Sequence, residues 1–550
     1  MSQMLKSSGA MGAATLASRV LGMLREILYA RFMGDGPVAG AFKLAFMAPN
    51  LFRRLLGEGA LTAAFIPLFK EKERASGDQE MWRAANAVIS GLIVAASAII
   101  GLVLLGISLV LLSDSPQNLG GLLMSGNTNA AQDFAKPVFP AAGWLNPETR
   151  LMLELLRVMF PYMLLVCLAA VFMGMLNSRG FFFIPAMGAA VLNGILIATV
   201  LWVAPRFGAT LEKQIFAVAI GVLVAGLAQA AYQLPLLWRE GFRYRWTPPW
   251  GNDTVRIVVR RMVPGMMGVA AFQINVVLTQ GIAFWFDPMI VASFDYAVRL
   301  MELPQGVFGI SLATFLLPTL SGLAAEKKFD EFRSTVRQAL GYLIFANLIA
   351  SVCLVVLAEP IIRLLFERGE FTALATRRAS FALACLAPGL IAFSTVNILA
   401  RAFYALGDTQ TPMKISCVCL ALNVVFVIGL AGPFRQGGLG IANTLSAAAN
   451  VWLLFHALRR KLKRLELGGL RRHVVQMAGS AILAGEAAWL CSAAWERWIG
   501  HVGIVESLGA VFVPLTIASL LYGAVLLGLK VPQAREFLDL LQQKLRRSKP

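Results

Sequence analysis

About fourteen long apolar segments run through this 550-residue chain, and they constrain its fold more than any other feature. A helix of about 20 apolar residues crosses the roughly 30 Å hydrocarbon core of a bilayer. Hydrophobic residues make up 58% of the chain and charged residues only 14%, which leaves too little polar surface for a soluble protein of this length. The sequence therefore predicts an all-α, polytopic membrane protein with about 14 transmembrane helices. The predicted spans are residues 9–33, 37–57, 84–113, 149–176, 183–204, 214–238, 256–285, 288–320, 335–358, 377–405, 411–432, 438–459, 473–495 and 506–529.

Basic residues gather in three parts of the chain, and these determine the predicted orientation. They are the connection after the sixth span (239–261), the connection after the twelfth span (459–472) and the tail (530–549). The positive-inside rule places all three in the cytoplasm together with both termini, and the polar segment 114–147 on the opposite side. The net charge of +19 then indicates anionic membrane lipids as partners rather than nucleic acid.

Prolines and glycines recur in the two halves of the chain and indicate an internal repeat. Three positions return after a displacement of 227 residues, namely Pro161, Gly180 and Pro185 at Pro388, Gly407 and Pro412. A chance alignment of prolines is the alternative. Parallel repeats of six spans predict two six-helix lobes around a central cleft, plus two C-terminal helices. The predicted divisions are 1–240 for the N-lobe, 241–465 for the C-lobe, 466–530 for the last two spans and 531–550 for a basic cytoplasmic tail.

Charged residues inside the first apolar span are the first candidate site. Arg19, Gly22 and Glu26 share one helix face, and Arg25 points about a third of a turn away. A lipid-facing arginine near mid-bilayer costs roughly 3 kcal/mol on insertion scales, so these side chains are expected to face a wet cavity. Arginine suits phosphate because its planar fork is always charged. Glu26 is expected to orient or partly neutralise Arg25. The alternative is an internal salt bridge that pins this span to a neighbour.

The second span and the second half of the chain supply further candidates. Lys43, Asn50 and Arg54 share a face of the second span, and snorkelling to lipid headgroups is the alternative interpretation of its terminal arginines. In the second half, Arg299 lies four residues after Asp295 and three before Glu302, so both acids are natural partners for it. Arginines contributed by both halves predict an anion site.

Motifs of enzymes and metal sites are missing from the sequence. The chain has no GxxxxGK[ST] phosphate loop, GxSxG elbow, HExxH motif or spaced Cys/His ligand set. We therefore expect a protein that is not an enzyme and needs no cofactor or metal.

Several sequence blocks in order resemble the MurJ/MviN lipid II flippases of the MOP exporter superfamily. The most specific are SRVLGMLRE (18–26), PNLFRRLLGEGALTAAFIP (49–67), LNSRGFFFIPA (176–186), YQLP (232–235), RLMELPQGVFGISLATFLLP (299–318) and FERGEFTA (366–373). The resemblance runs from about residue 4 to 530.

The resemblance implies a bacterial inner-membrane flippase that moves lipid II, an undecaprenyl-diphosphate-linked muropeptide, to the periplasmic leaflet for peptidoglycan assembly. It places the family's essential cavity arginines on Arg19, Arg25 and Arg299. It places the second-span arginine on Arg53 and the conserved turn on Glu58, Gly59 and Ala60. It also implies that the last two spans form a groove for the polyprenyl tail, and that periplasmic peptidoglycan synthases are candidate partners.

The sequence departs from the family pattern at two positions. Gly40 stands where relatives have an aspartate at the start of span two, and Val298 stands where relatives have an aspartate before the second-half arginine. Both losses make the predicted cleft more positive.

Alternating access driven by membrane potential or an ion gradient is the mechanism that this pattern favours. Two alternatives remain open at this point. One is another MOP-type exporter, for an undecaprenyl-linked polysaccharide or a drug, although a cationic drug would require an acid-lined cleft. The other is a membrane glycosyltransferase, which would need a catalytic carboxylate in an extracytoplasmic loop.

Overall fold

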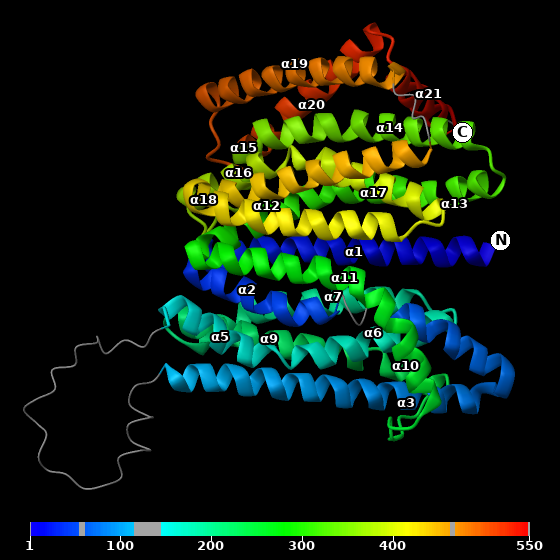
Figure 1. Ribbon diagram of the computed structural model, residues 1–550. Helices are drawn as coiled ribbons and strands as arrows, with labels where there is room; N and C mark the ends of the chain where they lie inside the picture. The colour runs from blue at the N-terminus through cyan, green and yellow to red at the C-terminus, as the bar shows by residue number, and fades with distance from the viewer. Residues whose placement is uncertain (1, 54–60, 115–144, 463–467, 548–550) are drawn as a thin grey trace, which may run out of the picture. The chain divides into compact units, whose positions relative to one another are not determined.

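The computed structural model describes residues 2–53, 61–114, 145–462 and 468–547, and these residues form helices without any strand (Figure 1). The predicted all-α class is confirmed. Glu58 and most of the predicted 114–147 loop lie outside the described residues. Contacts divide the chain into two compact units, residues 1–284 and 285–550, and each is described by itself below. The functional division predicted at residues 240, 465 and 530 stays a prediction.

Unit 1 begins with two helices that carry most of the first candidate site. Its helices are α1 (Ser2–Met33), α2 (Pro37–Phe52), α3 (Leu61–Ser113), α5 (Pro147–Met159), α6 (Tyr162–Ser178), α7 (Phe183–Ala198), a π-helical turn (Thr199–Val203), α8 (Ala204–Phe207), α9 (Leu211–Ala231), α10 (Leu234–Arg239) and most of α11 (Asp253–Phe286). Helix α1 packs on α7, and α2 packs on α5.

Unit 2 contains the remaining helices, among which α14, α19 and α20 pack side by side (Figure 1). They are α12 (Pro288–Pro304), a π-helical turn (Gln305–Ile310), α13 (Ser311–Ala325), α14 (Phe329–Val356), α15 (Ala358–Phe366), α16 (Ala373–Leu386), α17 (Gly389–Ala405), α18 (Gln410–Lys461), α19 (Gly468–Trp498), α20 (Ile504–Gly528) and α21 (Pro532–Arg547). The predicted basic tail contains the helix α21, which packs on α14 and α20.

Seven described helices are long and apolar enough to cross a membrane, or nine if two bent helix pairs each count as one span. The predicted count of fourteen therefore stays a prediction. Part of the difference between fourteen and nine arises because some long helical elements contain a non-helical residue at which the backbone changes direction. Helix α18 has 52 residues, about 78 Å at 1.5 Å per residue, which is more than twice the hydrocarbon thickness.

A sharp reversal at Arg435 divides α18 into two helices. Arg435 has φ 46° and ψ −119°, outside the helical region. A Cβ added to Gly438 would lie only 2.1 Å from the carbonyl oxygen of Leu430, so the chain folds back tightly enough to require glycine there. The reversal falls within the predicted connection 432–438 between spans eleven and twelve.

Residues paired by the sequence repeat adopt the same local conformations in both units. Pro161 precedes α6 and Pro388 precedes α17, at bends of 42° and 43°. Gly180 and Gly407 follow those helices with φ of 90° and 74°. In each case the next amide donates to the carbonyl five residues earlier, a glycine-dependent helix ending. Chance alignment does not account for two shared bends and two shared helix ends.

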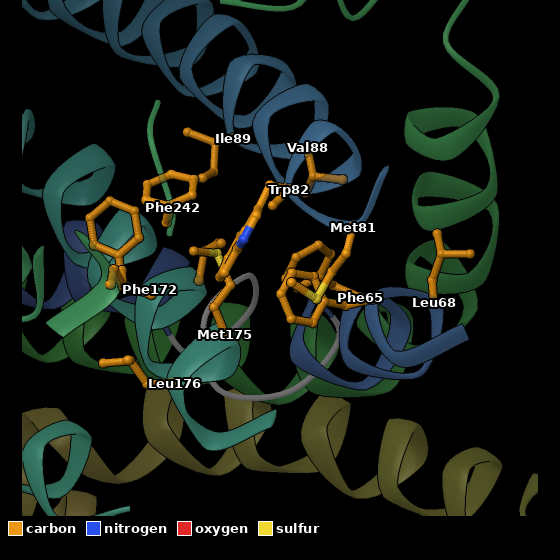
Figure 2. Close-up of a cluster of buried hydrophobic side chains, with 14 of the residues drawn as sticks. Phe65, Leu68, Met81, Trp82, Val88, Ile89, Phe172, Met175, Leu176 and Phe242 are labelled. Atoms are coloured by element: carbon orange, nitrogen blue, oxygen red, sulfur yellow. The ribbon is translucent and has the colours of Figure 1, made fainter. Parts of the chain in front are cut away.

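The core of unit 1 lies where α3, α6 and the start of α11 meet. Figure 2 shows the ring of Trp82 between Phe242 and Phe65, and its centroid is 5.5 Å from that of Phe242. Aromatic rings in such edge and tilted arrangements stabilise one another beyond their buried area. This cluster anchors the end of α6, where Arg179 begins the connection to α7.

Candidate functional site

Arg25 on α1 is the best-anchored candidate side chain in unit 1. Its Nη2 donates to Glu26 Oε1 at 2.5 Å, and its Nη1 donates to Asn193 Oδ1 at 2.9 Å. The guanidinium also lies 5.5 Å from the centre of the Tyr29 ring, within reach of a cation–π interaction. Glu26 thus contacts Arg25, as expected, and this contact would orient the guanidinium. The bond to Asn193 also ties α1 to α7, which is the kind of helix-to-helix link that the alternative interpretation expected.

Glu26 is a buried carboxylate that two cations share. Its side chain is 6% exposed, and Lys43 Nζ on α2 lies 3.9 Å from Oε2. Burying an ionised carboxylate is costly unless it is paired, and Arg25 and Lys43 supply that pairing. The cluster of Arg25, Lys43 and Glu26 carries one net positive charge.

Asn193 is the residue of this cluster that the sequence reasoning missed. It lies on α7, accepts from Arg25, and donates through Nδ2 to the backbone oxygen of Ser18 at 3.3 Å. A Cβ added to Gly22 would contact this amide at 3.5 Å, so Gly22 allows α1 to approach it. The available signal was a single amide inside the apolar segment VLNGILIA, at 191–198.

The other candidates of unit 1 lie farther along α1 and α2. Arg19 is exposed on α1. Arg53 follows the end of α2, and its Nε donates to Asn50 Oδ1 at 2.7 Å, so these two predicted residues contact each other. Glu58 lies outside the described residues. No role of these side chains is established by their geometry alone.

Arg299 on α12 is the candidate in unit 2. Its Nη1 donates to Glu302 Oε2 at 3.2 Å, and its Nη2 lies 3.7 Å from Asp295 Oδ1. Its side chain is 34% exposed, so it is partly accessible. Both expected acidic partners are therefore in place, and Asp295 supplies a carboxylate one turn before the arginine although position 298 is valine.

These groups are suited to binding an anion. Nη1 of Arg25 donates to Asn193 and Nη2 donates to Glu26, and these two hydrogen bonds fix the plane of the guanidinium. Fixed guanidinium groups recognise phosphate with both charge and geometry. Among the described residues, no group of three His, Cys, Asp or Glu side chains is placed to hold a metal ion.

Solved structures with the same fold define the class of the chain. A structure titled "Lipid II flippase MurJ, inward closed conformation" matches with a TM-score of 0.73 and 21% identity over 94% of this chain and 99% of that one. An inward-facing multidrug resistance MATE family transporter of the MOP superfamily matches with a TM-score of 0.61 and 16% identity over 82% of this chain and 96% of that one. The chain thus shares its fold with these two solved membrane proteins.

Sequence comparison gives the family within that class. The family described as "Lipid II flippase MurJ" matches residues 29–508. A probable lipid II flippase MurJ of Haemophilus influenzae is 30% identical over 94% of this chain and 98% of its own length. The chain belongs to the MurJ family of membrane transporters.

Proposed function

We propose that this protein flips lipid II, the undecaprenyl-diphosphate-linked muropeptide, from the cytoplasmic to the periplasmic leaflet of the bacterial inner membrane. The observation that carries the proposal is the family match over residues 29–508, joined to a partly buried, oriented arginine in α1. The diphosphate is the part of such a substrate that would recognise a cluster of guanidinium groups. The activity for which the relatives are named is thus proposed for this chain as well.

Arg19, Arg25 and Arg299 are the proposed diphosphate ligands, with Arg53 as a further contact. The proposed supporting groups are Glu26, Lys43, Asn50, Glu58 and Glu302. The pairing of Arg25 with Asn193 and Glu26 supports a preset guanidinium. A preset group loses less rotamer freedom when the substrate binds.

Alternating access is the proposed transport cycle. Binding of the diphosphate neutralises the arginines, the site closes to the cytoplasm and then opens to the periplasm. An inside-negative potential favours outward movement of an anion by about 2.3 kcal/mol per charge per 100 mV. The last two spans are the proposed site of the polyprenyl tail, with both termini in the cytoplasm.

The family match favours this function over the two alternatives. A drug exporter for cations would need acidic groups where Arg25 and Arg299 stand, and a glycosyltransferase would belong to an enzyme family. Anionic lipids and periplasmic peptidoglycan synthases are proposed partners on the strength of charge and of the substrate's fate.

The test is lipid II translocation in proteoliposomes that contain the purified full-length chain. Arg19→Gln, Arg25→Gln and Arg299→Gln are each expected to lower the initial rate at least tenfold. Arg83→Gln, at an exposed arginine of α3 that pairs with the exposed Glu80, is the matched control and should keep the rate. Full rates in all three variants at equal protein levels would overturn the proposed site, whereas no flipping by the unmodified chain would overturn the proposed substrate.

A further inference from the structure

A groove of about 510 Å³ lies in unit 2, and no candidate residue discussed above lines it. Its polar side consists of Asp408 and Thr411, which precede and begin α18, and of His456, Arg460 and Lys461 near the end of α18. Its volume lies within the range of about 300–1,000 Å³ that small-molecule sites occupy. The groove belongs to α17 and α18, and the flippase proposal assigns it no role.

One acidic and two basic side chains set the charge of the groove. Lys461 Nζ donates to Asp408 Oδ2 at 2.5 Å, and Thr411 donates to the same carboxylate through its hydroxyl at 2.9 Å and its amide at 3.0 Å. These donors hold the pKa of Asp408 at about 2, so the carboxylate is ionised and locally neutralised. Among the described residues, Arg460 lines the groove without an acidic partner. One positive charge thus remains for a ligand.

The other side of the groove is apolar. Phe403 of α17 and Ile415 and Leu453 of α18 line it. Trp452 lies beside it, is 67% exposed, and stacks on His456 with ring centroids 6.0 Å apart. An exposed tryptophan next to basic residues at a helix end is typical of the level of lipid headgroups. The groove therefore offers a cation to a headgroup and an apolar wall to an acyl chain.

The equivalent end of unit 1 lacks this balance of charge. Arg179, which follows α6, contacts Glu240 at 3.1 Å, Glu73 at 2.7 Å and Asp78 at 3.4 Å. Three carboxylates around one guanidinium leave no positive charge for an anion. Lys70 also pairs with Glu73 there, at 2.7 Å, so the described charges of this cluster are three carboxylates and two cations, whereas those lining the unit 2 groove are one carboxylate and two cations.

We propose that the groove formed by Asp408, Thr411, His456 and Arg460 with Phe403, Ile415 and Leu453 binds one acidic phospholipid of the cytoplasmic leaflet. Arg460 contacts the phosphodiester, and the first part of an acyl chain lies along the apolar wall. The alternative role of Arg460 is to stabilise the end of α18, because cations complement the partial negative charge of a helix C-terminus. The inference rests on the proposed function only for the leaflet, since that orientation places the end of α18 in the cytoplasm.

The test measures lipid binding to the purified full-length chain by native mass spectrometry during titration with phosphatidylglycerol. Phosphatidylcholine with the same acyl chains and inorganic phosphate are the comparison ligands. We expect phosphatidylglycerol to be retained at least fivefold better than phosphatidylcholine, with no displacement by phosphate. Arg460→Gln should weaken phosphatidylglycerol binding about fivefold, because a basic group near a lipid surface contributes about 1 kcal/mol.

Arg459→Gln is the matched control, because Arg459 is the neighbouring exposed arginine of the same helical turn but does not line the groove. It should leave binding within twofold of the unmodified chain. Lys461→Gln should weaken binding as well, because it exposes the charge of Asp408 to the anion. Equal losses in Arg460→Gln and Arg459→Gln, equal retention of the two lipids, or displacement by phosphate would each overturn the proposal. If the termini were labelled from the periplasmic side, the assignment of the groove to the cytoplasmic leaflet would be wrong. If the chain bound phosphatidylglycerol as expected but did not flip lipid II, the proposed function would be wrong and the lipid site would stand.

Discussion

Arg25 and the buried Glu26 form a largely buried charge pair in which structural and functional roles can be separated. Removing one member of such a pair leaves an uncompensated charge and typically costs about 3–5 kcal/mol. Lys43, 3.9 Å from Glu26, offsets part of that cost. We therefore expect Arg25→Gln to destabilise the protein by about 3 kcal/mol, measured by thermal unfolding in detergent.

The double variant Arg25→Gln/Glu26→Gln removes both charges of the pair and serves as the control for that loss. It should recover only part of the thermal stability, because Lys43 then loses Glu26, while lipid II translocation stays at least tenfold reduced. Wild-type translocation by a stable double variant would mean that Arg25 only holds the fold together.

Asn193 fixes Arg25 from α7, so its loss should act through the arginine. Asn193→Ala removes a hydrogen bond to a charged group, worth about 1.5–3 kcal/mol, and leaves the guanidinium less constrained. We expect a lower unfolding temperature and a several-fold higher lipid II concentration for half-maximal transport. Asn443→Ala is a suitable control because that side chain donates to Leu439 O of its own helix. Equal effects of the two substitutions would contradict a positioning role for Asn193.

Asp408 should give a pH-dependent contribution to stability. Its pKa falls from 3.8 to about 2 in the folded chain because Lys461 and Thr411 donate to it. A depressed pKa means that the stabilisation is complete above about pH 4 and is lost as the pH falls towards 2. Asp408→Asn should thus lower the unfolding temperature at pH 7, with a cost of about 1 kcal/mol. The difference from the unmodified chain should shrink between pH 4 and pH 2, and a difference independent of pH would refute this linkage.

At the scale of elements, the reversal inside α18 depends on glycine rather than on flexibility. An alanine methyl at position 438 would overlap the carbonyl of Leu430, and backbone atoms cannot rotate away. Overpacking of this kind typically costs about 1–3 kcal/mol. Gly438→Ala should therefore lower the unfolding temperature clearly. Gly429→Ala lies earlier in the same element, where an added methyl meets nothing within 4 Å, and it should be neutral or slightly stabilising.

Hydropathy predicted where helices run, and turn residues predicted where several of them break. The prolines at 161 and 388 and the glycines at 180 and 407 were informative because their backbone requirements are local. The number of crossings was less accessible, because length and composition do not distinguish a bent helix pair from two helices. In the candidate site, arginines inside apolar spans were visible as exceptions to their surroundings. Asn193 was not, because its importance comes from a partner 168 positions away.

At the scale of the whole molecule, the charge of the cargo connects structure to energy supply. A diphosphate moving outward would carry negative charge down an inside-negative potential, whereas the site arginines remain in the protein. Each charge that crosses the full field gains about 2.3 kcal/mol per 100 mV, which corresponds to roughly a fiftyfold shift in equilibrium. Closure of the site while it holds the anion would couple this energy to the direction of transport. Hydrolysis of ATP by the chain itself is not needed for such a cycle.

Proteoliposomes with a potassium diffusion potential test this coupling directly. An interior-negative potential of about 100 mV should increase lipid II translocation out of the cytoplasm-equivalent leaflet several-fold, and a reversed potential should suppress it. Neutralisation of Arg299 together with Glu302 keeps the local charge balance of α12 and provides the matched variant, because the two side chains pair at 3.2 Å. That variant should flip lipid II slowly at every potential. The ratio of its rates with and without the potential should equal that of the unmodified chain, because the charge of the cargo is unchanged. A translocation rate that does not respond to voltage would show that the potential does not drive the cycle, and the energy would then have to come from a coupled ion.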